Sequence, residues 1–177
     1  MAAAELERRP LIVALVAVWV VTAACALLVG VVPGVSRLAV SWFDAPLTAG
    51  SNPPPTVGRA LELALHNMRV FCFPFLLAAA RLQQRRLRIV VDVLLVADVV
   101  VQAGLVGAAL GAYQTRVAPY LLPHLVFEWL GMAAAIAVWL IARRRIVTRR
   151  ELTILAAVFV VALLTAGFLE TYATPHR

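Results

Sequence analysis

Two of the chain's long apolar stretches contain ionisable side chains at helical spacing. In LLPHLVFEWL, residues 121–130, His124 and Glu128 are four residues apart, so a helix would stack them on one face. An earlier stretch holds Glu62, His66 and Arg69, which at 100° per residue project within about 60° of one another. A charge inside a membrane costs several kcal/mol, so such groups should face a partner or a wet cavity. Groups of this kind bind ions or conduct protons.

A metal site is one reading of these residues. His124 and Glu128 together with His66 could supply two imidazoles and one carboxylate, a ligand set used by zinc enzymes. The chain lacks the HExxH motif, however, and no serine or cysteine adjoins either histidine. We therefore assign no catalytic residue, metal ligand or cofactor from the sequence, and an intramembrane metallopeptidase or peptide cyclase is the third of three functional hypotheses.

The composition decides which elements position these groups. The chain is 63% hydrophobic and 14% charged, whereas soluble domains are roughly half apolar and about a quarter charged. A transmembrane helix needs about 20 residues, and each of the five apolar runs has roughly this length. Apolar residues are continuous in each run and do not alternate with polar ones, as they would in the strands of a membrane barrel. The sequence predicts one all-α integral membrane domain over residues 1–177, with a bundle of five transmembrane helices. The predicted spans are 11–32, 60–80, 89–112, 119–142 and 152–170.

The first run, which stays uncharged for 22 residues, is interpreted as a span, because the apolar core of a signal peptide is usually about 7–15 residues long. The long connection between the first two spans contains Val35–Leu47, where apolar and charged residues alternate irregularly. This segment predicts a short interfacial helix in the first outer loop. The loops on the other side are too short for a nucleotide site, so another chain would have to supply any energy.

The distribution of arginine among the connections predicts how the chain is oriented in the membrane. All 16 basic residues are arginine, and most lie in the segments 8–9, 81–88 and 143–150, which alternate with arginine-poor connections. Positive charge stays on the cytoplasmic side, so we expect a cytoplasmic N-terminus and an extracytoplasmic C-terminus in a bacterial cell membrane. The net charge of +7 is then explained by arginines facing anionic lipid headgroups. Membrane lipids are expected partners and nucleic acid is not.

Depth suggests which polar groups meet. At a rise of about 1.5 Å per residue, Arg69 and Glu128 each lie about 13 Å from the outer ends of their spans, and we predict that they form an ion pair. The predicted polar pocket opens in the outer half of the bundle; the alternative is a satisfied network that only fixes helix register. Its residues are Glu62, His66, Asn67, Arg69, Gln102, His124, Glu128 and Glu170.

Three other features lie on the third span. Gly107 and Gly111 form a small-xxx-small pair typical of close helix packing. Asp92 is expected to reach back to the arginine cluster at the cytoplasmic end. Asp98 is expected to stack toward Gln102 and to extend the polar network inward.

With these residues in view, the chain resembles the stage II sporulation protein M family of membrane proteins. The resemblance lies in His66-Asn67-Met68-Arg69-Val70, in Pro123-His124 with Glu128, and in Glu170-Thr171-Tyr172-Ala173-Thr174-Pro175. Two positions depart from the family pattern. Leu125 stands where a glycine usually follows Pro-His, and Gln102-Ala103 stands where the family has Asn-Gly, although the later Gly107 is kept.

The resemblance, together with the absence of a complete catalytic constellation in the sequence, favours a function without enzymatic activity. The sporulation member of the family is similar to a scaffold that recruits cell-wall hydrolases, and other members accompany ATPases or genes for circular bacteriocins. Our first hypothesis is a scaffold or an export and assembly partner that binds a hydrolase, an ATPase or an exported peptide through the polar pocket. The second is a transport or channel component that works with a separate ATPase. A homo-oligomer is compatible with both.

Overall fold

The computed structural model describes residues 2–48, 54–80 and 84–173, and this part of the chain is all-helical, without a strand. Four helices are long and apolar enough to cross a membrane, and a bent pair makes a fifth span if it is counted as one. The predicted all-α class is thus confirmed, and the number of helices that could span a membrane is four or five, depending on whether the bent pair counts as one span. The helices are α1 (Ala2–Val31), α2 (Pro33–Thr48), α3 (Val57–Phe71), α4 (Phe73–Ala79), α5 (Arg85–Tyr113), the short 3-10 helix η1 (Gln114–Arg116), α6 (Ala118–Ala142) and α7 (Arg149–Ala173).

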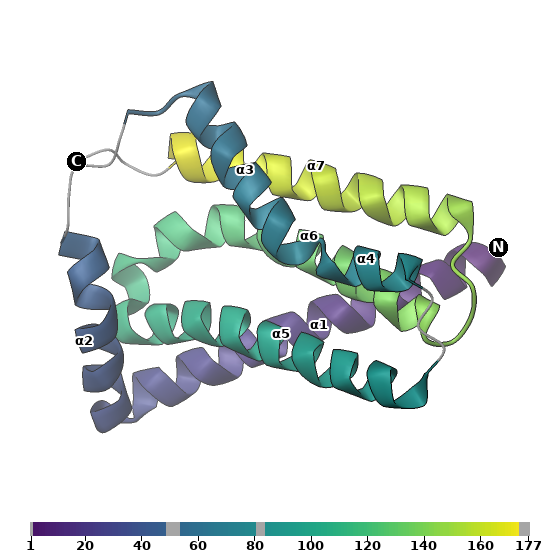
Figure 1. Cartoon of the computed structure of the whole chain (residues 1–177). Coiled ribbons are helices and arrows are strands. Elements are labelled where there is room, and N and C mark those ends of the chain that lie inside the picture. The colour runs from purple at the N-terminus through teal and green to yellow at the C-terminus, as the bar shows by residue number, and fades with distance from the viewer. Residues whose placement is uncertain (1, 49–53, 81–83, 174–177) are drawn as a thin grey trace.

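The second span is broken rather than continuous. The sequence predicted one helix over 60–80, but α3 ends at Phe71 and α4 begins at Phe73, with a bend of 45° between them. Pro74 at the start of α4 explains the break, because proline has no N–H and its ring clashes with the carbonyl four residues earlier, that of Val70. The two pieces therefore take different directions across the bundle (Figure 1).

The central element is α6, which packs against α1 on one side and against α7 on the other. Trp129 of α6 is fully buried, and it shares a hydrophobic core with Val18 of α1 and Leu163 of α7. The bent segment spans two neighbours, since α3 packs on α7 whereas α4 packs on α6. On the far side α5 packs against α1. This packing brings Asn67 of α3 to the junction of α6 and α7.

The contact between α1 and α5 is a close approach of two backbones. A Cβ atom at Gly107 would lie 2.3 Å from the carbonyl oxygen of Thr22, and one at Gly111 would lie 2.4 Å from that of Ala26. Real Cβ atoms do not come this close to an oxygen, so a side chain at either position would push the helices apart. This contact joins α5 to the rest of the bundle.

The two ends of the bundle differ in charge. The N-terminus of α1, the start of α5 and the α6–α7 connection lie at one end (Figure 1), here called the basic end. The other end, here called the opposite end, holds α2, η1, the start of α3 and the C-terminus of α7. The described arginines of the basic end are Arg9, Arg85, Arg86, Arg88, Arg143, Arg144, Arg145, Arg149 and Arg150.

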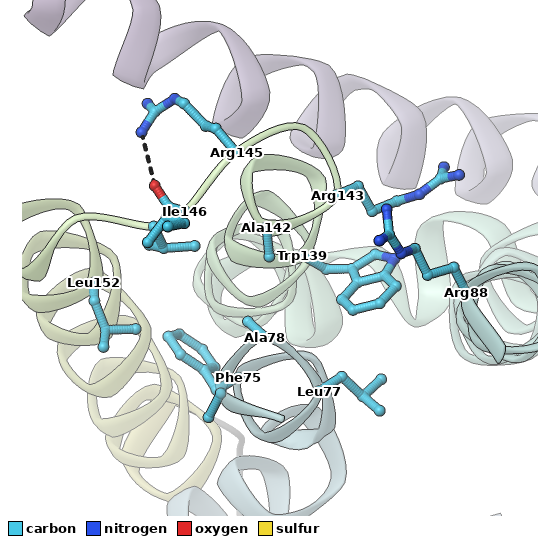
Figure 2. Close-up of a pocket in the computed structure, with 12 residues that line it drawn as sticks. Phe75, Leu77, Ala78, Arg88, Trp139, Ala142, Arg143, Arg145, Ile146 and Leu152 are labelled. Atoms are coloured by element: carbon cyan, nitrogen blue, oxygen red, sulfur yellow. Dashed lines mark hydrogen bonds between the residues drawn. The ribbon is translucent and has the colours of Figure 1, made fainter. Parts of the chain in front are cut away.

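A cavity of about 540 Å³ lies at the basic end between α4, α5, α6 and the start of α7 (Figure 2). Asp92 of α5 fixes its wall, because Arg143 Nη2 pairs with Asp92 Oδ2 at 3.0 Å and Trp139 Nε1 donates to Asp92 Oδ1 at 2.9 Å. The prediction that Asp92 reaches back to the arginine cluster is confirmed. The cavity itself was not predicted.

The start of α7 is fixed by a capping box. Thr148-Arg149-Arg150-Glu151 has the S/T-x-x-E pattern, and Glu151 Oε2 accepts from the Thr148 amide at 2.9 Å and from its hydroxyl at 2.8 Å. The Glu151 amide donates back to Thr148 Oγ1 at 3.2 Å. Both carboxylate oxygens also accept from the guanidinium of Arg145. Glu151 is buried, so these donors are its main compensation for lost water.

Candidate functional site

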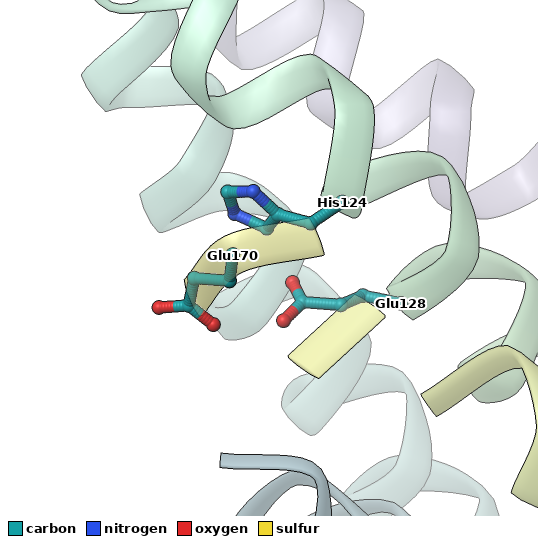
Figure 3. A group of neighbouring side chains, drawn as sticks. All are labelled: His124, Glu128 and Glu170. Atoms are coloured by element: carbon teal, nitrogen blue, oxygen red, sulfur yellow. The ribbon is translucent and has the colours of Figure 1, made fainter. Parts of the chain in front are cut away.

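Three acid or imidazole side chains meet where α6 and α7 pack together. The potential ligand atoms of His124, Glu128 and Glu170 all lie within 4.8 Å of one another, and we call this group the His–Glu–Glu cluster. Glu128 reaches from α6 toward Glu170 on α7, with His124 one turn earlier on α6 (Figure 3). His124 is buried, and the two carboxylates are half-buried.

Neighbouring groups fix the orientation of two cluster members. Asn67 Nδ2 of α3 donates to Glu128 Oε1 at 2.6 Å. The backbone of Tyr120, one turn earlier on α6, interacts with the His124 ring. A carbonyl in this position can accept from one ring nitrogen and leave the other nitrogen as an acceptor.

A close approach of α3 to α7 brings Asn67 to the cluster. A Cβ atom at Gly167 would lie 2.5 Å from the carbonyl oxygen of Ala60 and 3.1 Å from the Ala64 Cβ, so glycine lets the two backbones touch. Ala60 and Ala64 are buried at this contact, and Asn67 follows them at helical spacing. The α3 face that meets α7 is thus built from small residues and ends in an amide.

Negative charge dominates the cluster. Glu128 and Glu170 repel each other when both are ionised, and Arg59 acts on Glu170 with the opposite sign. Arg59 is shared with another carboxylate, because its Nη1 lies 3.1 Å from Glu62 Oε2 in an exposed ion pair. Two adjacent carboxylates in apolar surroundings are costly unless a proton or a cation joins them.

The predicted pocket is formed only in part. Glu62, His66 and Arg69 are exposed, and the expected ion pair between Arg69 and Glu128 is absent. The reason is geometric, because the face of α3 that contacts α7 lies on roughly the opposite side of the helix from this stripe. Asn67, which belongs to the contact face, takes the place that was assigned to Arg69.

The third span contributes no hydrogen bond to this group. Gln102 is half-buried on α5, a helix that packs against α1 and α2, and it makes none with the described polar residues of α3, α6 or α7. Asp98, expected to stack toward Gln102, is exposed on α5. It makes no hydrogen bond or ion pair within the described ranges 2–48, 54–80 and 84–173. The sequence named the cluster residues but not their pairing, which the spacing Ala60-x3-Ala64-x2-Asn67 could have indicated.

Comparison with models of protein families, with curated proteins and with solved structures found no match. The resemblance to the stage II sporulation protein M family therefore stays a prediction. The motif residues quoted for the resemblance lie on α3, α6 and, up to Ala173, α7, whereas Thr174 and Pro175 lie outside the described residues.

The geometry predicts unequal effects of two neighbouring substitutions. Asn67→Ala should lower the free energy of unfolding by about 1–3 kcal/mol, since it leaves the Glu128 carboxylate without its donor. Arg69→Gln changes an exposed residue and should stay within about 0.5 kcal/mol. Equilibrium unfolding in mixed detergent micelles measures both. A larger loss of stability with Arg69→Gln than with Asn67→Ala would instead support an ion pair between Arg69 and Glu128, which the structure lacks.

Proposed function

We propose that the chain is a non-enzymatic, multi-pass membrane protein that acts as a scaffold or as an export and assembly partner. It binds a protein or peptide partner within the membrane, along the exposed face of α5. The resemblance to the stage II sporulation protein M family supports this class of function. Candidate partners are a cell-wall hydrolase with a membrane anchor, a transport ATPase or an exported peptide.

The observation that carries the proposal is the position of Asp98. It lies 13 residues after Arg85 and 15 before Tyr113, the two ends of α5, so it is about 20 Å from either end at a rise of about 1.5 Å per residue. Its exposed neighbours Leu94 and Val101 are apolar, as a lipid-facing surface requires. A carboxylate that faces hydrocarbon at this depth is costly. A partner helix with a cationic or hydrogen-bonding group removes this cost.

Charge favours a different protein over a second copy of this chain. Two copies that met along this face would place two Asp98 carboxylates at the same depth, where like charges repel. A partner carrying arginine, lysine or histidine at this depth would instead form a charge-assisted hydrogen bond.

Orientation belongs to the same proposal. We place the basic end in the cytoplasm of a bacterial cell, because arginine-rich connections are retained on that side. The opposite end then faces outward, with α2 at the interface and the His–Glu–Glu cluster near the outer surface. The stacked rings of Phe168 and Tyr172, with centroids 6.1 Å apart, support an interface at this level of α7.

In-membrane crosslinking tests the partner surface. A photo-crosslinking residue at Val101, which is 55% exposed one turn from Asp98, should give one defined adduct with a different protein in native membranes. Asp98→Leu should reduce that adduct by about tenfold or more, the equivalent of one lost charge-assisted contact. Val93→Ala, a change at an exposed apolar residue of α5, should leave the yield unchanged.

Two outcomes contradict the proposal. One is an adduct whose yield is the same with Asp98→Leu, which would mean that the carboxylate has no part in the contact. The other is an adduct made only of two copies of this chain, which would assign the face to self-association.

A further inference from the structure

The His–Glu–Glu cluster has the composition of a metal site. His124 and Glu128 come from one face of α6 and Glu170 comes from α7, so the three potential ligands belong to two helices that pack together along their length. We propose that His124, Glu128 and Glu170 bind a divalent ion of the first transition series, of the Zn²⁺ or Mn²⁺ class. The proposal does not depend on the scaffold function or on the Asp98 surface.

The distances allow such an ion with small side-chain adjustments. Zinc binds imidazole nitrogen at about 2.0–2.1 Å and carboxylate oxygen at about 2.0–2.2 Å. Two ligand atoms on one tetrahedral ion are therefore about 3.3–3.6 Å apart, and the three groups already lie within 4.8 Å of one another. The long glutamate side chains can supply the remaining movement. An exposed edge of each half-buried carboxylate leaves a path for the ion to enter.

The surrounding hydrogen bonds are of the kind that prepare metal ligands. A ligating histidine usually donates its other ring N–H to a carbonyl or a carboxylate, which fixes the tautomer and directs the free nitrogen to the ion. The backbone of Tyr120 lies where it can accept such a bond from His124. Ligating carboxylates are held in the same way, and Asn67 Nδ2 holds Glu128 from 2.6 Å. Both partners, Asn67 of α3 and the backbone of Tyr120, lie outside the cluster itself.

The ligand types select the class of ion. Imidazole suits zinc, iron and nickel, whereas carboxylates alone suit magnesium, calcium and manganese. One imidazole with two carboxylates favours Zn²⁺ or Mn²⁺ over Ca²⁺. A divalent cation also balances the two carboxylates, for which Arg59 is only partly available because it pairs with Glu62. The bound ion would crosslink α6 to α7 at the opposite end of the bundle.

The membrane-extracted full chain, purified through a tag without histidine, tests the site. After dialysis against Zn²⁺ and then against metal-free buffer, inductively coupled plasma mass spectrometry should find about one zinc ion per chain. Glu128→Gln, Glu170→Gln and His124→Asn should each remove it. Asn67→Ala should weaken binding by about 10–100-fold, as loss of an outer hydrogen bond does.

Matched control variants test whether other potential metal ligands in the chain hold the ion. Glu62→Gln changes an exposed carboxylate of the same region, and His66→Asn removes the histidine that the sequence had suggested as a ligand. Cys25→Ser with Cys72→Ser removes the thiols. All three variants should keep the ion, and Co²⁺ in place of Zn²⁺ should give an absorption spectrum that Glu170→Gln alters.

Three outcomes would overturn the proposal. In the first, the purified chain holds no more Zn²⁺ or Mn²⁺ than its Glu170→Gln variant, and a proton shared between the carboxylates then takes the place of the ion. The ion could persist in the variant that lacks all three ligands. It could also be lost with His66 and not with Glu170, which would assign a different set. Circular dichroism of each variant checks that the helices remain.

Discussion

Replacing Gly107 with alanine is expected to lower the free energy of unfolding by about 1–3 kcal/mol, the usual cost of an overpacked contact. The added Cβ would lie 2.3 Å from the Thr22 carbonyl oxygen and 2.8 Å from the Cys25 Cβ. The nearest obstacle is backbone, which cannot rotate away, so α1 and α5 must separate. Much of the packing along this pair of helices would then be lost.

Gly104→Ala is the matched control for this change. Gly104 lies one turn earlier on α5, and a Cβ there would meet only Cys25 Sγ at 3.6 Å, an ordinary contact. In a helix the same substitution then gains about 0.5–1 kcal/mol from lower chain entropy. The two variants should therefore shift stability in opposite directions. Reversible unfolding in mixed micelles measures the difference, and equal shifts would show that the backbones of α1 and α5 do not touch.

The second large effect is expected from Glu151→Gln. This change keeps the shape of the side chain but removes the negative charge. The carboxylate accepts hydrogen bonds from the Arg145 guanidinium and from the amide and hydroxyl of Thr148. We expect a loss of about 2–3 kcal/mol, below the cost of breaking a fully buried pair, because the Arg145 side chain is 40% exposed and that of Glu151 only 3%.

Glu62→Gln serves as the comparison for Glu151→Gln. Glu62 also pairs with an arginine, but both side chains are exposed, at 70% for Glu62 and 41% for Arg59, and exposed pairs contribute less than about 1 kcal/mol. Thermal unfolding in one detergent ranks the two variants. Near-equal losses would mean that burial of Glu151 adds nothing to its ion pair and that the capping box does not stabilise the start of α7.

The helices were predictable because the length of an apolar run is a local property. The spans over 89–112 and 119–142 agree with α5 and α6 within a few residues. The break in the second span was not predicted, although Pro74 is visible in the sequence, since the apolar run continues through it. Hydropathy measures whether a segment suits a membrane and not whether its backbone stays straight.

The sequence predicted which residues belong to the site but not which of them contact each other. Depth along a span gives the height of a residue, and Arg69 and Glu128 have similar heights. Which residues meet also depends on how each helix is rotated about its axis. Ala60 and Ala64 against Gly167 set that rotation for α3 and direct Asn67 inward, with Arg69 outward. The spacing of Ala60, Ala64 and Asn67 marks one face of α3. A single sequence does not reveal which other helix that face contacts, because contacts between helices are long-range.

The bend at Cys72 has a mechanical consequence. It divides one membrane crossing into two short rods that are held by different neighbours, α3 by α7 and α4 by α6. Proline leaves a missing hydrogen bond at this joint, so bending stiffness is lowest there. The rod beside the basic-end cavity and the rod that carries Asn67 meet at this joint. A displacement of one rod is absorbed there as a change of angle, so it reaches the other rod more weakly than it would along an unbroken helix.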